Sequence, residues 1–122
     1  MPSKDPVQRF EDILHNIELI EEFTEGMDKH AFSQDAKTTN AAERCLERIS
    51  EAARKLGDLA EGLCPEIPWS KVRALGNFLR HEYDIVDVLR VWLTIQNDLP
   101  PLKAAVQMAL KRHLEPREGN EH

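Results

Sequence analysis

The chain has 122 residues and a formal charge of −6, with 41% apolar and 31% charged residues. This length suits one compact domain that needs neither disulfides nor a metal, and no apolar run reaches the roughly 18 residues of a membrane-spanning helix. The negative charge argues against a protein that coats nucleic acid nonspecifically, because such proteins carry a net basic surface.

The distribution of charge, the amino terminus and the cysteines predict where an anionic ligand could bind and where the protein resides. Residues 1–66 hold 8 Lys and Arg against 15 Asp and Glu, whereas residues 67–122 hold 8 against 7, so the second half should tolerate an anionic ligand better. The amino terminus lacks the apolar core of a signal peptide, so we expect a cytoplasmic protein. Cys45 and Cys64 lack the paired spacing of a zinc site and are expected to be buried or bystander thiols.

The first half predicts two long helices. Apolar residues recur at helical spacing almost throughout, and no alternating run is long enough for a strand, so the fold class is all-α. Asp5-Pro6 is typical of a helix start and predicts a helix over residues 6–25, which Gly26 ends. A second helix is expected from Asp35 to Gly57, antiparallel to the first. The core-facing residues are Phe10, Ile13, Leu14, Ile17, Ile20, Ala42, Cys45, Leu46, Ile49, Ala53 and Leu56.

The second half predicts shorter helices. Residues 27–34 are ambiguous, and residues 57–67 are expected to form an irregular connection in which Leu59 and Leu63 reach the core. A third helix should run from Pro68 to His81 or Tyr83. A fourth should start at the N-cap Asp87, and Pro100 and Pro101 should place the start of a fifth near Asp98. The expected core residues are Val72, Leu75, Leu79, Val88, Val91, Trp92, Ile95, Leu99, Leu102, Ala105, Val106 and Ala109.

These elements predict a bundle of four to five helices, with two antiparallel long helices and a third helix that carries the chemistry. The bundle is expected to occupy residues 1–115, followed by a disordered tail over residues 116–122.

The segment 69–83, WSKVRALGNFLRHEY, concentrates the groups that could carry chemistry. On a helical projection Arg73, Asn77, Arg80 and His81 share one arc, opposite the apolar stripe. Arginine offers fork-shaped donors to a phosphate, and histidine exchanges protons near neutral pH. This set therefore suits the handling of a phosphodiester. The other interpretation is that Arg80 and His81 only stabilise the carboxyl end of a helix, as cations commonly do.

Several short motifs together resemble the HepT-like family of the HEPN superfamily. They are Glu51-Ala52-Ala53, Ile67-Pro68-Trp69, His81-Glu82-Tyr83 and the NDLPP stretch over residues 97–101. They occur in the family's order, and the resemblance covers most of the chain.

This resemblance implies a helical bundle that dimerises, so that the motif helices of two chains form one cleft. It implies a metal-independent endoribonuclease without a cofactor, paired with a nucleotidyltransferase antitoxin of the MNT class. His81 would move the proton of the RNA 2′-hydroxyl, Asn77 would orient, and Arg73 or Arg80 would bind the phosphate. In some members the antitoxin transfers adenylyl groups to a tyrosine placed like Tyr83.

One departure from the family pattern leaves a second function open. Gly76 replaces the arginine that should precede Asn77, and seven residues separate Arg73 from His81, just outside the family's four to six. Arg73 or Arg80 would have to take the place of the missing motif arginine. The alternative is a non-catalytic HEPN subunit that binds a nucleotidyltransferase and a nucleotide, and the third possibility is a purely structural bundle.

Overall fold

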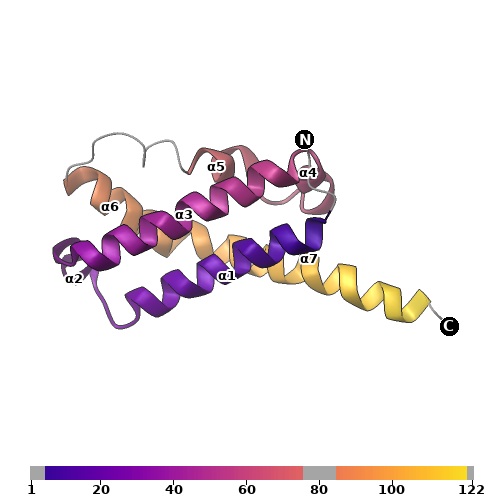
Figure 1. Ribbon diagram of the computed structural model, residues 1–122, viewed down its shortest axis with the longest axis horizontal. Helices are drawn as coiled ribbons and strands as arrows, with labels where there is room; N and C mark the ends of the chain where they lie inside the picture. Colours follow the sequence, from indigo (N-terminus) through magenta and orange to yellow (C-terminus); the bar gives the residue numbers. More distant parts are fainter. Residues whose placement is uncertain (1–4, 76–84, 121–122) are drawn as a thin grey trace.

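The computed structural model describes residues 5–75 and 85–120, and these residues form helices without a strand. Figure 1 labels seven α-helices in chain order. They are α1 (Pro6–Thr24), α2 (Lys29–Gln34), α3 (Ala36–Leu56), α4 (Leu59–Leu63), α5 (Trp69–Ala74), α6 (Ile85–Leu93) and α7 (Leu99–Asn120), with a π-helical turn, η2 (Thr94–Asp98), between α6 and α7. The predicted all-α class is confirmed.

Aspartate side chains begin the first three helices. Asp5, Asp28 and Asp35 each accept a hydrogen bond from a backbone N–H in the first turn of the helix that follows. The donors are Gln8, Ala31 and Thr38, at 3.1, 2.8 and 3.1 Å. At Asp35 the hydrogen bonds from Thr38 lower the pKa of the carboxyl below its usual value. The predicted starts of the two long helices are therefore confirmed, and α2 lies in the stretch that the sequence left ambiguous.

Glycines follow the ends of both long helices. Gly26 has a φ of +78° and Gly57 a φ of +57°, values that side chains with a Cβ rarely adopt. Both lie where the sequence predicted a helix to stop.

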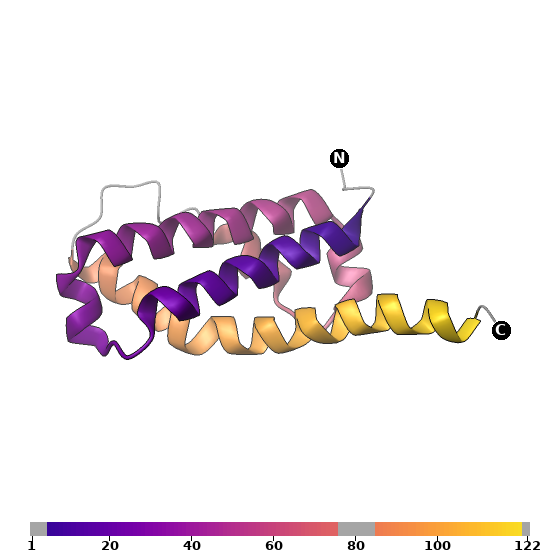
Figure 2. The same ribbon diagram turned by 60° about the horizontal axis from the view of Figure 1, so that its bottom comes forward.

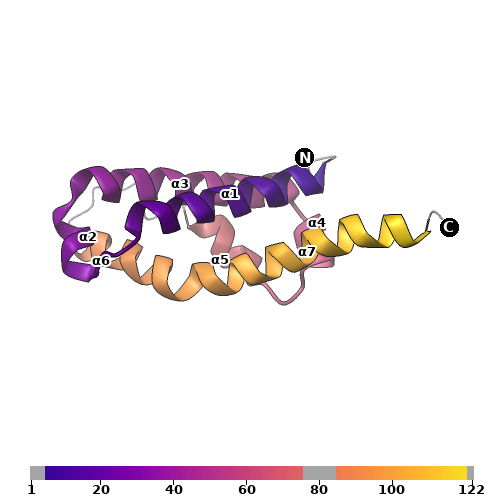
Figure 3. The same cartoon turned by 90° about the horizontal axis from the view of Figure 1, so that it is seen from below.

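The two long helices pack side by side and antiparallel, and Figures 1 and 2 show them running next to each other, with the carboxyl-terminal part of α7 extending beyond them. Figure 3 shows α1 and α3 on one side, with α4 to α7 on the other. Apart from Leu59, the described residues that the sequence assigned to the core are buried or packed against the core. An ion pair between Lys103 and Glu21, 2.8 Å apart, joins α7 to α1. None of the described helices has the length and apolarity to cross a bilayer.

The NDLPP stretch produces a local widening of the helix. Pro100 and Pro101 have no N–H, so Gln96 and Asn97 cannot receive the usual hydrogen bond from four residues ahead. The backbone instead forms the π-helical turn η2, in which the N–H of Leu99 donates to the carbonyl of Thr94. The predicted interruption is thus a change of helix type, followed directly by α7.

Two elements of the fold differ from the predictions. The connection after Gly57 contains a short helix, α4, whose Ala60 is buried, while Leu59 is 41% exposed and does not enter the core. Helix α6 begins at Ile85, so Asp87 lies within it rather than at its cap. The division at residue 115 stays a prediction, although the helical backbone of α7 continues to Asn120.

Candidate functional site

One of the predicted site residues lies within the part of the chain that the structure describes, and the others lie outside it. Arg73 lies in the last turn of α5 and is described, whereas Asn77, Arg80, His81 and Tyr83 lie outside the described residues. The site can therefore be built up to the end of α5, from which the motif segment continues.

The amino end of α5 is fixed by Trp69. This side chain is 1% exposed, and its indole Nε1 donates to the carbonyl of Cys64 at 2.8 Å. Its ring lies 6.3 Å from that of Phe10 in α1, between centroids, at an interplanar angle of 54°. Val72, one turn later, is also buried. These contacts explain why the Ile-Pro-Trp motif stands at the start of this helix: Pro68 opens it and Trp69 anchors it.

The carboxyl end of α5 is held by two side chains of α3. Ser50 Oγ donates to the carbonyl oxygen of Arg73 at 2.6 Å, and Arg54 Nη2 donates to the same oxygen at 3.0 Å. These two contacts join the last turn of α5 to α3. Sequence reasoning missed both residues, although they flank the Glu51-Ala52-Ala53 triplet that it did single out.

The guanidinium of Arg73 is engaged within the fold. Its Nη1 and Nη2 bind the two carboxylate oxygens of Glu61 at 2.8 and 2.7 Å, and Nη2 also donates to the carbonyl of Gly57 at 2.8 Å. The hydrogen bonds from Arg73 lower the pKa of the Glu61 carboxyl, and Glu61 in turn raises the pKa of Arg73. These contacts use three of the five N–H donors of the guanidinium, including both of those on Nη2.

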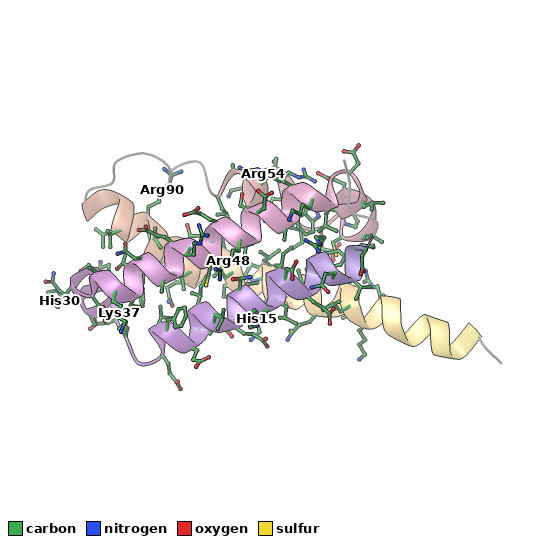
Figure 4. All side chains as sticks on the ribbon, viewed as in Figure 1. His15, His30, Lys37, Arg48, Arg54 and Arg90 are labelled. Carbon is green, nitrogen blue, oxygen red and sulfur yellow. The ribbon has the colours of Figure 1, made fainter. Side chains whose placement is uncertain are left out.

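A groove of about 480 Å³ lies beside the end of α5. Two of the family-like motifs meet in it, because Ile67 and Pro68 line it together with Asn97, Asp98, Leu99 and Pro101. Its remaining residues come from the loop before α5, from α5 to α7 and from η2, and they are Glu66, Lys71, Val72, Ala74, Leu75, Arg90, Leu93, Thr94 and Leu102. Arg90 is labelled in Figure 4. Apolar side chains and charges of both signs therefore line the groove.

The cysteines take no part in a described site. Cys45 and Cys64 are both buried and free, as predicted, and burial raises the pKa of each thiol. Within residues 5–75 and the described part of the second half, no three His, Cys, Asp or Glu side chains gather as metal ligands would.

The chain matches a family model described as ribonuclease HepT-like over residues 13–109. It is 41% identical to a protein of Thermococcus cleftensis named "Probable ribonuclease HepT", over 83% of this chain and 92% of that protein. It is also 32% identical to a Methanocaldococcus jannaschii protein named a "Putative RNase", over 91% of this chain and 96% of that protein. No solved structure gives a significant match.

Proposed function

This chain belongs to the HepT-like ribonuclease family, and we propose that it is the toxin of a toxin–antitoxin pair, which cuts RNA without a metal at a cleft between two copies. The match over residues 13–109 to ribonuclease HepT-like proteins carries the proposal. In this mechanism His81 removes the proton of the 2′-hydroxyl as that oxygen attacks the adjacent phosphorus. The 5′-oxygen of the next nucleotide leaves and takes up a proton, while an arginine balances the charge on the phosphate.

Of the two arginines that the sequence left open, we propose Arg80 as the phosphate ligand. The guanidinium of Arg73 already binds Glu61 and Gly57 with three of its five N–H donors, so it has fewer donors left for a phosphate. Asn77 is proposed to orient the phosphate or His81. The purified protein, assayed alone with a defined RNA and excess EDTA, tests the whole proposal. No cleavage under conditions where the protein is folded would reject it.

The second candidate function is a non-catalytic subunit that binds a nucleotidyltransferase. It is favoured by Gly76 in place of the motif arginine and by the engagement of Arg73, which together leave fewer cations for a phosphate. A protein that binds its partner tightly but cuts no RNA, alone or after release from that partner, would match this function.

The dimer is proposed to form across the groove beside α5, with a second copy as the occupant. Leu93 lines this groove, yet 54% of the surface of this apolar residue is exposed. The groove carries Lys71 and Arg90 as well as Glu66 and Asp98, so a two-fold axis could bring each cation near an acid of the other copy. This arrangement places α5 at the interface, as the resemblance implies.

Replacing Leu93 with glutamate is expected to weaken the dimer by about tenfold or more, because a charge would be buried in an apolar contact. Sedimentation equilibrium over micromolar concentrations measures the change. Met108→Glu is the matched control, since Met108 is 49% exposed on α7 and does not line the groove. A wild-type protein that stays at 14.0 kDa, or equal effects of the two variants, would rule out this interface.

Tyr83 is proposed as the position at which an MNT-class antitoxin silences the toxin. The phenol oxygen would attack the α-phosphorus of ATP and pyrophosphate would leave, which adds bulk and negative charge beside the cleft and repels RNA. The opposing interpretation is that Tyr83 packs in the core. Incubation with the cognate nucleotidyltransferase and ATP should add one adenylyl mass to the wild type and none to Tyr83→Phe. Equal mass gain in both proteins, or none in the wild type, would exclude Tyr83.

A further inference from the structure

A line of exposed cations follows the outer face of α3. Lys37, Arg44, Arg48 and Lys55 are all exposed and are separated by seven, four and seven residues. At 100° per residue these spacings keep the four within about 20° of one line, which extends for roughly 27 Å along the helix axis. Figure 4 labels Lys37 at the start of α3 and Arg48 near its middle. These four residues are called the basic stripe.

Three of the four stripe residues have no ion-pair partner among the residues that the structure describes. Arg44 pairs with Glu47 at 3.8 Å, with 67% of its side chain exposed, whereas Lys37, Arg48 and Lys55 make no such pair. Glu51 lies on the same side of the helix but pairs with Arg54 at 3.7 Å. The stripe therefore offers charges that are hydrated and available to a ligand.

The charge is concentrated on this helix in a chain that is acidic as a whole. Helix α3 holds five Lys and Arg against three Glu, and one of these, Glu43, is only 4% exposed. Helix α1 beside it holds one Arg against five Asp and Glu. The net charge of the chain is −6, so this basic face on α3 stands out from the acidic remainder. A local basic surface of this kind is typical of a site that binds a polyanion.

The stripe lacks the apolar anchors that a protein or membrane partner uses. Among the described residues, the exposed large apolar side chains are Phe23, Leu59, Leu93 and Met108, and none lies on α3. Protein interfaces and membrane-bound helices depend on buried aromatic or aliphatic groups, whereas sequence-independent binding to a nucleic-acid backbone depends mainly on positive charge. A phosphodiester chain is thus the favoured ligand.

The carboxyl end of the basic stripe lies near the candidate site. Lys55 is adjacent in sequence to Arg54, whose Nη2 reaches the carbonyl of Arg73 at the end of α5. The carboxyl end of the stripe is therefore next to the point from which the motif segment continues.

We propose that the basic stripe binds the phosphate backbone of the substrate RNA on one side of the cleavage site. The proposal rests on the ribonuclease function and adds the path of the RNA over the surface, since Lys37, Arg44, Arg48 and Lys55 would contact phosphates beyond the scissile one. Such residues set RNA affinity rather than the rate of bond cleavage.

The test compares two triple variants with the same loss of charge. The stripe variant is Lys37→Gln, Arg48→Gln and Lys55→Gln. The control variant is Lys29→Gln, Lys111→Gln and Arg112→Gln, which changes three exposed cations outside the stripe. Binding is measured by fluorescence anisotropy with a labelled single-stranded RNA whose 2′-oxygens are methylated, so that it cannot be cleaved by its own hydroxyls. Titrations are repeated at several salt concentrations.

The stripe variant is expected to bind at least about tenfold more weakly at 0.1 M salt, and the control variant to remain within about threefold of the wild type. The slope of log affinity against log salt should become shallower by about 2 in the stripe variant, since each phosphate contact on a single strand contributes about 0.7. Equal losses in both variants would show a general effect of net charge and would overturn the proposal, as would an unchanged stripe variant.

Two further outcomes separate this proposal from the ribonuclease function. A wild type that binds the methylated RNA through the stripe but cuts no RNA would support the stripe and reject the nuclease. A wild type that cuts RNA while the stripe variant binds and cuts equally well would reject the stripe alone. If vesicles containing phosphatidylserine are bound through the stripe and the RNA is not, the surface faces a membrane and the proposal is wrong.

Discussion

Replacement of His81 by alanine is expected to lower the rate of RNA cleavage by about 10²- to 10⁴-fold, the usual contribution of a general acid–base group. Imidazole is the side chain whose ordinary pKa lies near neutral pH, so it can take a proton from the 2′-hydroxyl and return one to the leaving oxygen. His81 is the one histidine in the motif segment 69–83. Single-turnover cleavage of a defined RNA, measured from pH 5 to 9 in EDTA, gives the rate and its pH profile.

The controls for this experiment are histidines that lie away from the motif segment. His15 in α1 and His30 in α2 are both exposed and are labelled in Figure 4, so their alanine variants should cut at the wild-type rate. Thermal unfolding should agree among all the variants. If His81→Ala cuts RNA with the wild-type rate and pH profile, His81 has no part in the chemistry and the proposed mechanism fails.

The helices could be predicted because their boundaries depend on neighbouring residues. Asp5 and Asp35 cap the helices that follow them, and Gly26 and Gly57 adopt the positive φ that ends a helix. The core residues could be predicted for the same reason, because the 3.6-residue period of a helix determines which apolar residues share its inner face. Leu59 is the exception: the turn of α4 buries Ala60 instead, and a five-residue helix is too short for its spacing to indicate which side faces inward.

The contacts that fix the end of α5 could not be predicted, because they join residues far apart in the sequence. Ser50 and Arg54 reach the carbonyl of Arg73 across 23 and 19 positions, and Glu61 binds its guanidinium across 12. A helical projection of α5 places Arg73 on a polar arc but does not show which neighbours will occupy that arc. The sequence therefore identified Arg73 as a candidate and could not show that its side chain is already engaged.

The count of charges by halves also concealed the basic stripe. The first half has an excess of acids, which pointed to the second half as the place for an anionic ligand. That count adds the acids of α1 to the cations of α3, although the two helices present different faces to solvent. The signal that could have found the stripe is the spacing of Lys37, Arg44, Arg48 and Lys55, which is the spacing of one helix face.

Arg80 and Arg73 are expected to give opposite results when each is replaced by alanine. Arg80→Ala should slow cleavage by about tenfold or more, since a charge-assisted contact to the reacting phosphate is worth roughly 1.5–3 kcal/mol, and should leave the melting temperature unchanged. Arg73→Ala should lower the melting temperature by a few degrees, because it removes the bonds to Glu61 and Gly57. Below that temperature it should keep most of its activity. Rates and melting curves are measured on the same preparations.

Glu61→Gln separates the two roles of Arg73, because it weakens the ion pair and leaves the guanidinium in place. The pKa of Glu61 is lowered from its ordinary 4.5, so this carboxylate stabilises the fold at neutral pH, and that contribution is lost as the pH falls through the folded-state pKa. The gap in melting temperature between the wild type and Glu61→Gln should therefore be full at pH 7 and close on acidification. A different outcome would contradict this assignment: Arg73→Ala loses as much cleavage activity as Arg80→Ala, while Glu61→Gln has the melting temperature and the cleavage rate of the wild type. Arg73 would then bind the phosphate, and its bond to Glu61 would break when RNA binds.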